Sequence, residues 1–181
     1  MRNDILKILK TEEEIQNRVR ELGESLARDY ADKFPVVICV LKGSVMFFAD
    51  LLKHMPIPLT LDFMSVSSYR NGTAGGAIHI RQELTAPVED RNVIIVEDII
   101  DSGRTLSMLK PLLIARGARS VSIVTLLDKP SRRDPSVTLV PEYMGFEIPD
   151  EFVVGYGLDY AERYRNLPFI GVLKPEVYEN A

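Results

Sequence analysis

Three short apolar runs constrain the fold of this 181-residue chain more than any other feature. They cover residues 36–41, 93–96 and 120–127, and valine, isoleucine and leucine dominate each of them. A strand with one face in water alternates apolar and polar residues, whereas a strand covered on both faces is apolar almost throughout. We therefore expect these runs to be strands of one sheet with helices on both faces.

Helical patterns occupy the segments beside these runs. Residues 11–30 begin with a capping box and continue with apolar residues at helical spacing. Residues 45–52 and 105–115 are also predicted as helices, and Gly117 has the C-cap position of the latter. Alternating strands and helices are typical of an α/β fold, so we expect a mainly parallel, twisted sheet flanked by helices, in a single domain covering residues 1–181.

Composition and charge disfavour several classes of function. The net charge is −4, with lysine and arginine scattered along the chain, which argues against general binding to nucleic acid or to an anionic membrane. No apolar run approaches the ~20 residues that cross a bilayer, and the N-terminus has no signal-peptide core. The single cysteine, Cys39, lies in an apolar run and is expected to be buried; its use fits the cytoplasm.

The segment after the second run has the residues of a phosphate-binding turn. Ligands of open parallel sheets bind at the carboxyl ends of strands, and residues 97–105 lie between such a strand and a helix. Gly103 has no Cβ, so backbone N–H groups can approach an anion closely. Ser102 and Thr105 add hydroxyl donors, Arg104 adds a cation, and the helix N-terminus adds partial positive charge. Neither a Walker A loop nor a dinucleotide fingerprint is present.

Three carboxylates, Glu97, Asp98 and Asp101, lie in the same turn. Acids crowded beside a phosphate are unfavourable unless another group is bound there. Carboxylates accept hydrogen bonds from vicinal hydroxyls such as those of a ribose, and they bind Mg²⁺. An alternative, in which Asp101 only caps the helix, does not explain Gly103. The turn is therefore predicted to hold a ribose phosphate.

Residues 93–106 closely resemble the phosphoribosyl-pyrophosphate signature of type I phosphoribosyltransferases, and the resemblance covers nearly the whole chain. Residues 41–44 look like the family's pyrophosphate loop, and residues 67–69 look like the start of its lid. Residues 127–130 and 152–160 look like the base-binding segments of the branch that acts on hypoxanthine and guanine. The resemblance implies the type I phosphoribosyltransferase fold, with a small base-binding hood formed from the chain termini.

The resemblance also implies a reaction of purine salvage. A phosphoribosyl group would pass from phosphoribosyl pyrophosphate to N9 of hypoxanthine or guanine, giving IMP or GMP and pyrophosphate. Mg²⁺ would be the cofactor, and the enzyme would be a homodimer or homotetramer without a nucleic-acid or membrane partner.

On the donor side, the resemblance implies that Asp101 is the general base, which accepts the proton near purine N7 as N9 attacks. The 5′-phosphate would be bound by consecutive residues of the turn, namely Asp101, Ser102, Gly103, Arg104 and Thr105. The metal ligands would be Glu97, Asp98 and Asp159, and the first two would also bind the ribose hydroxyls. The leaving pyrophosphate would contact Lys42, Gly43 and Arg165, with a cis peptide between Leu41 and Lys42.

On the base side, the resemblance implies that the purine contacts Lys129, Phe152, Val153 and Asp159. A lysine ammonium only donates hydrogen bonds, so Lys129 suits the O6 acceptor of hypoxanthine or guanine and opposes the amino group of adenine. Phe152 offers a ring for stacking on the base. Ser68 and Tyr69 would begin the lid that closes over the donor.

Two alternatives stay open. An enzyme of the same fold could prefer xanthine, which differs from guanine only at position 2, an edge that backbone carbonyls near Val153 and Asp159 would read. Proteins with this signature also include nucleotide-sensing, RNA-binding regulators, which need a basic face that scattered charges do not provide. Kinetics with the three bases and an RNA-binding assay would separate these functions.

Overall fold

The computed structural model describes residues 1–68 and 78–179 and contains one six-stranded and one three-stranded sheet. The larger sheet has the strand order β4-β3-β2-β5-β6-β7. Its strands are β2 (Val36–Leu41), β3 (Thr60–Ser68), β4 (Ile78–Gln82), β5 (Asn92–Ile100), β6 (Ser120–Asp128) and β7 (Tyr143–Glu147). All neighbours pair in parallel except β3 and β4, as expected for a mainly parallel sheet.

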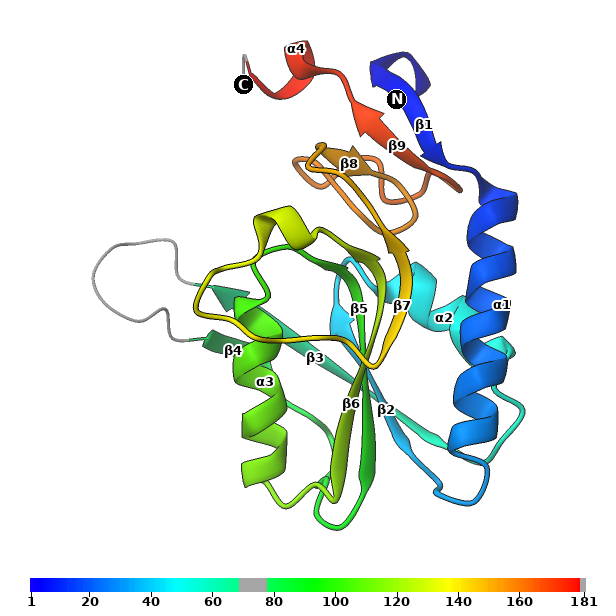
Figure 1. The fold of residues 1–181 in the computed structure, drawn as a ribbon, viewed down its shortest axis with the longest axis vertical. Helices are drawn as coiled ribbons and strands as arrows, with labels where there is room; N and C mark the ends of the chain where they lie inside the picture. Colours follow the sequence, from blue (N-terminus) through cyan, green and yellow to red (C-terminus); the bar gives the residue numbers. More distant parts are fainter. Residues whose placement is uncertain (69–77, 180–181) are drawn as a thin grey trace.

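Three helices cover the two faces of this sheet (Figure 1). Helices α1 (Glu12–Asp29) and α2 (Val45–Lys53) lie on one face, and α3 (Arg104–Ala115) lies on the other. Because both faces are covered, β2 and β5 are buried along most of their length, which explains their continuous apolar sequence. The expected α/β architecture is therefore confirmed. Among the described residues, no helix combines the length and the apolarity needed to span a bilayer.

The smaller sheet forms a hood from both ends of the described chain (Figure 1). Its order is β1-β9-β8, with β1 (Ile5–Lys10), β9 (Ile170–Leu173) and β8 (Val153–Val154) all antiparallel, and α4 (Pro175–Tyr178) follows β9. Two 3-10 turns complete the elements, Arg2–Asp4 and Pro130–Arg132. Val153 and Ile170 pack in the same apolar cluster as α1 and α2, which attaches the hood to the main sheet.

The main difference from the sequence prediction concerns the length of β5. The strand was expected to end at Val96, but it continues to Ile100, which pairs with Asp128 of β6. Glu97 and Asp98 are therefore strand residues, and the turn begins at Asp101. The strands β1, β7, β8 and β9 were not located from the sequence, because none of them has a continuous apolar run as long as that of β2.

Candidate active site

A cavity of about 310 Å³ lies at the carboxyl ends of β2 and β5, below the hood. Both ends of the predicted site line it: Glu97, Asp98, Asp101, Ser102, Gly103 and Thr105 from β5 and its turn, with Gly43, Asp159 and Arg165 from the pyrophosphate loop and hood. A larger cavity, of about 1080 Å³, lies between α3 and residues 134–140. We assign the site to the smaller cavity because the carboxylates and the glycine turn converge there.

The turn before α3 has the conformation of an anion nest. Gly103 is the N-cap of α3 with φ of +77°, a left-handed value that favours glycine, and the Arg104 N–H donates to Oγ of Ser102 at 3.4 Å rather than to Asp101. A Cβ at Gly103 would lie 3.0 Å from Nη1 of Arg133 and from Cγ1 of Val137. The alternative in which Asp101 caps the helix is therefore wrong. The other N–H groups of the first helical turn have no acceptor within the helix, so they are available to an anion.

Glu97 and Asp98 form a pair of carboxylates at the end of β5. Glu97 is buried and Asp98 half-buried. Burial raises the pKa of both groups, and the neighbouring charge of Asp98 raises the pKa of Glu97 further. A bound cation stabilises such a pair. Mg²⁺ prefers oxygen ligands, and it usually binds one or two carboxylates together with water molecules and oxygens of the substrate.

The third expected metal ligand, Asp159, makes its polar contacts with residues of the hood. Its carboxylate pairs with Nη2 of Arg165 at 2.9 Å and accepts a hydrogen bond from the backbone N–H of Glu162. Within residues 1–68 and 78–179, no group of three or more His, Cys, Asp or Glu side chains could hold a metal ion. The side chains present fit a metal that completes its coordination with substrate and water.

The expected pyrophosphate loop, residues 41–44, lies at the end of β2. The Leu41–Lys42 peptide bond is cis, the isomer that the resemblance implied. The Lys42 ammonium is exposed and pairs with Glu162 at 3.2 Å. Arg165 lines the cavity and donates from Nη1 to the Gly157 carbonyl at 2.7 Å, whereas its Nε is buried without a hydrogen-bond partner in the described part of the chain. An unpartnered guanidinium N–H is a donor for an anion.

Gly157 brings the hood against the pyrophosphate loop. Its φ is +101°, and a Cβ there would lie 1.9 Å from the carbonyl oxygen of Gly43. Two neighbours, Gly155 and Tyr156, also have positive φ. Tyr156 is anchored by its hydroxyl, which donates to Asp50 of α2 at 2.7 Å. This left-handed segment holds the hood over the end of β2.

The expected base-binding residues lie around the end of β6 and in the hood. Lys129 is buried, burial lowers its pKa, and its Nζ donates to the Glu151 carbonyl at 2.7 Å. Phe152 is 40% exposed and stacks on Tyr178, with 4.8 Å between ring centroids. Val153 is buried in β8. Of the expected lid, Ser68 ends β3, and Tyr69 lies outside the described residues.

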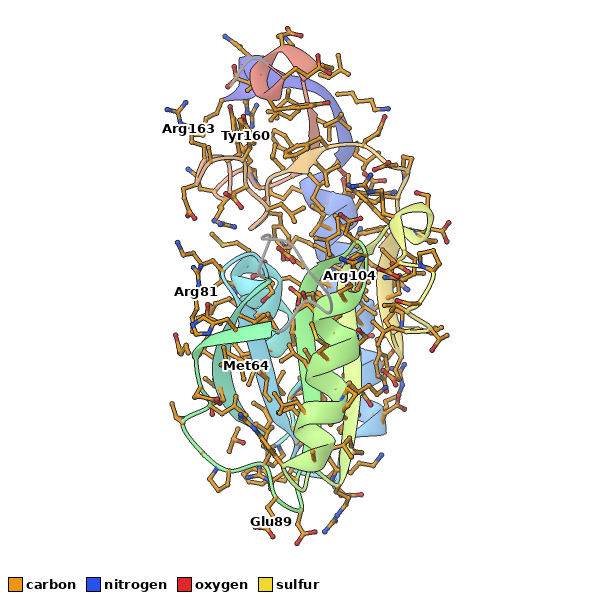
Figure 2. The ribbon with its side chains drawn as sticks, turned by 90° about the vertical axis from the view of Figure 1, so that its left-hand side faces the viewer. Met64, Arg81, Glu89, Arg104, Tyr160 and Arg163 are labelled. Atoms are coloured by element: carbon orange, nitrogen blue, oxygen red, sulfur yellow. The ribbon has the colours of Figure 1, made fainter. Side chains whose placement is uncertain are left out.

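The expected phosphate-binding turn and the expected base-binding residues meet where β5 and β6 end. Ile100 pairs with Asp128, and the backbone N–H of Lys129 donates to the Ile100 carbonyl at 2.9 Å. Asp101, the expected general base, and Lys129, the expected purine-binding lysine, therefore each follow directly after one of two paired residues at the ends of adjacent strands. Arg104 lies at the end of α3 that faces the hood, whereas Glu89 lies at the end of the molecule farthest from the hood (Figure 2).

Sequence reasoning missed three residues that contact the turn, Arg132, Arg133 and Asp134. Arg132 pairs with the Asp101 carboxylate at 3.4 Å, Arg133 donates to the Asp101 carbonyl at 3.2 Å, and Asp134 pairs with Arg104. Their only signal in the sequence is a cluster of charges that begins two positions after the first base-binding segment, residues 127–130.

This chain is similar to known proteins over nearly its whole length. The phosphoribosyl transferase domain model matches residues 6–161. The chain is 57% identical over 181 residues to the hypoxanthine-guanine phosphoribosyltransferase of Bacillus subtilis, covering 99% of both chains. It is 56% identical over 179 residues to the bifunctional protein TilS/HprT of Listeria innocua, covering 98% of this chain and 27% of that protein. A hypoxanthine phosphoribosyltransferase structure from Staphylococcus aureus matches with a TM-score of 0.94 at 51% identity, covering 98% of this chain and 96% of that one.

Proposed function

This chain belongs to the phosphoribosyl transferase domain family, and we propose that it is a purine-salvage enzyme that makes IMP and GMP. It transfers the 5-phosphoribosyl group from phosphoribosyl pyrophosphate to N9 of hypoxanthine or guanine. The C1′–oxygen bond of the donor breaks, the C1′–N9 bond forms, and pyrophosphate leaves. One observation carries the proposal: the anion nest that follows β5 and the buried Lys129 that follows β6 lie side by side, because the two strands are paired, and two carboxylates lie next to the nest.

The donor binds across the cavity. Backbone N–H groups of residues 101–105 and the hydroxyls of Ser102 and Thr105 hold the 5′-phosphate, and Arg104 adds positive charge. Lys42, Gly43 and Arg165 hold the pyrophosphate. The support for the second set is that Gly43 and Arg165 line the same cavity as the nest, and that Arg165 has an unpartnered N–H.

Asp101 is the general base. Its carboxylate lies beside the nest and is half exposed, so it can accept the proton that leaves the purine ring as N9 bonds to C1′. When C–O cleavage runs ahead of bond formation, the ribose gains oxocarbenium character, as in glycoside hydrolysis. Stabilising negative charge on the leaving group is then the largest contribution that the chain's cationic side chains make.

Mg²⁺ is the proposed cofactor. Glu97 and Asp98 would hold one ion together with the ribose hydroxyls, and Asp159 would hold a second on the pyrophosphate side. Bound Mg²⁺ would supply positive charge that neutralises the donor's phosphates. The support is the adjacent carboxylates of Glu97 and Asp98: burial raises the pKa of both groups, and the charge of Arg165 offsets this only in part at Asp98.

The base subsite combines Lys129, Phe152, Val153 and Asp159. Lys129 donates to O6 of the purine. Tyr178 covers one face of the Phe152 ring, and the other face of that ring stacks on the purine. Ser68 and Tyr69 belong to the lid that excludes water during the reaction. A buried lysine is better suited to select a 6-oxo base than an exposed one, because its donor cannot exchange freely with water.

Xanthine is the second candidate acceptor, because it presents the same O6 edge to Lys129. An RNA-binding regulator is disfavoured by the net charge of −4. We also propose that residues 1–181 form one domain, supported by the apolar cluster shared by hood and sheet, and that the protein works in the cytoplasm as a homodimer or homotetramer. Sedimentation equilibrium tests the assembly.

Steady-state kinetics test the proposed function. Purified protein is assayed with phosphoribosyl pyrophosphate, Mg²⁺ and each of hypoxanthine, guanine, xanthine and adenine, with release of pyrophosphate as the readout. Turnover of hypoxanthine or guanine at higher kcat/KM than xanthine, and little turnover of adenine, is expected. A preference for xanthine selects the second candidate, and binding to RNA without turnover of any base contradicts both.

A further inference from the structure

Three consecutive residues, Arg132, Arg133 and Asp134, contact the phosphate turn from outside; we call them the clamp. The Asp134 backbone N–H donates to the Ser102 carbonyl at 3.0 Å, and its carboxylate pairs with Arg104. Arg132 reaches the Asp101 carboxylate. Each clamp residue thus contacts the segment 101–104, although some thirty positions separate the two in sequence.

Arg133 is the central member of the clamp, and its side chain is far less exposed than that of Arg132. Its side chain is 16% exposed, compared with 55% for Arg132. Nη2 pairs with Asp128, and Nη1 donates to the Asp101 carbonyl at 3.2 Å. The same guanidinium packs against Gly103, because a Cβ there would lie 3.0 Å from Nη1. One planar group therefore fixes both the start and the glycine of the nest.

The other partner of Arg133 precedes the proposed purine reader. Asp128 is the last residue of β6, it is buried, and Lys129 follows it directly. The backbone N–H of Arg133 also donates to the Pro130 carbonyl at 3.1 Å, which closes the short turn that starts at Lys129. Arg133 accordingly bridges the two segments that are proposed to bind opposite ends of the nucleotide.

We propose that Arg133 is a positioning residue that fixes the distance between the phosphate nest and Lys129, so that one nucleotide can contact both. This inference rests on the proposed function. In this role Arg133 contacts neither the phosphate nor the base itself. Its effect is to let one nucleotide bind through its phosphate and its base at the same time. If the nest were displaced relative to Lys129, the nucleotide would lose part of one of these two contacts.

The fork geometry of arginine is required for this role. A lysine at the same position keeps the charge near the nest but cannot reach Asp128 and the Asp101 carbonyl with two parallel N–H groups. Glutamine keeps an amide donor and loses the charge. The two substitutions R133K and R133Q therefore separate the electrostatic contribution of Arg133 from its geometric contribution.

Binding measurements on the full chain with Mg²⁺ test the proposal. Isothermal titration gives Kd for IMP, ribose 5-phosphate and pyrophosphate with the parent, R133K and R133Q. R116Q is the control, because Arg116 pairs with Glu83 at the far end of α3 and its loss changes the net charge equally. In both Arg133 variants we expect IMP to bind about tenfold or more weakly, the loss for ribose 5-phosphate to be several-fold smaller, and pyrophosphate to change less than twofold.

Each other outcome has a defined meaning. Equal losses for IMP and ribose 5-phosphate, or an R133K variant that binds IMP as the parent does, would overturn the positioning role and leave a purely electrostatic one. Equal losses for all three ligands, with a lowered Tm, would mean that Arg133 only stabilises the fold, and this also overturns the proposal. If the parent protein binds neither IMP nor pyrophosphate, the proposed function itself is wrong.

Discussion

The carboxylate of Asp98 packs directly against the α-carbon of Gly43: a Cβ on Gly43 would lie 1.6 Å from Oδ2 of Asp98. The pyrophosphate loop and the acidic end of β5 are therefore in contact although 55 positions separate them in sequence. Because β2 and β5 are parallel neighbours, their carboxyl ends meet at one edge of the sheet. This contact joins the proposed pyrophosphate and ribose subsites.

Substitution of Gly43 by alanine should impair activity more than stability. The methyl group forces the Asp98 side chain to rotate, whereas the buried core stays intact. We expect kcat/KM for phosphoribosyl pyrophosphate to fall at least tenfold, with a loss of unfolding free energy of about 1–3 kcal/mol. Kinetics and urea denaturation measure the two effects. G157A is the contrasting variant: its methyl group meets the Gly43 backbone at a positive φ, so it should lose stability as well.

Substitution of Asp101 by asparagine should lower kcat by about 10²-fold or more and change donor affinity little. The amide keeps the shape of the side chain and its contact with Arg132 but cannot accept the proton of the purine. Single-turnover rates and Kd for the donor measure both quantities. An S136A variant, which alters a hydroxyl that bonds to Asp134 outside the cavity, serves as a control. Near-parental turnover by D101N would remove Asp101 from the mechanism.

Activity should require Mg²⁺ and disappear in excess EDTA. The carboxylates of Glu97 and Asp98 are adjacent and buried or half-buried, so a donor that adds further negative charge is repelled unless a cation is present. Rates are measured after chelation and again after stepwise addition of MgCl₂, which should restore them. Full turnover in metal-free buffer would contradict the assignment of this pair as metal ligands.

The parts of the fold with strong local signals were predictable from sequence. The apolar run of β2 and the capping box of α1 both appear where they were expected, because burial on two faces and N-terminal capping leave clear patterns. Gly103 was singled out because the lack of a Cβ lets backbone N–H groups approach an anion, and the structure adds a positive φ at this residue. These features depend on residues that are close together in the chain.

Features that depend on distant contacts could not be predicted in the same way. Periodicity ended β5 at Val96 because Glu97 and Asp98 are polar, but pairing with β6 extends the strand through both residues. Arg133 has no local pattern, since its partners, Asp128 and the Asp101 carbonyl, come together only in the folded chain. The depth of Lys129 also follows from packing under the hood rather than from its neighbours in sequence.

Cys39 should be unreactive in the native protein. It is fully buried in β2, as its sequence context predicted, and burial raises the pKa of its thiol to about 11. Since the thiolate is the reactive form, the neutral thiol that prevails at pH 8 should resist a disulfide reagent. Titration with that reagent should detect no free thiol in the native protein and one thiol per chain in urea. Rapid labelling of the native protein would contradict this.

Substitution of Lys129 by alanine should weaken discrimination against adenine. The Lys129 ammonium is buried and donates to the Glu151 carbonyl, so it is held where only an acceptor on the base can face it. A donor facing the adenine amino group costs about 1–3 kcal/mol, so the ratio of kcat/KM for hypoxanthine over adenine should fall by roughly 5- to 150-fold in K129A. The ratio is the measured quantity because it cancels losses that affect both bases equally. K7A is the matched control: Lys7 pairs with the Glu151 side chain from β1, and its loss should leave the ratio unchanged. If K129A rejects adenine as strongly as the parent does, another group reads O6.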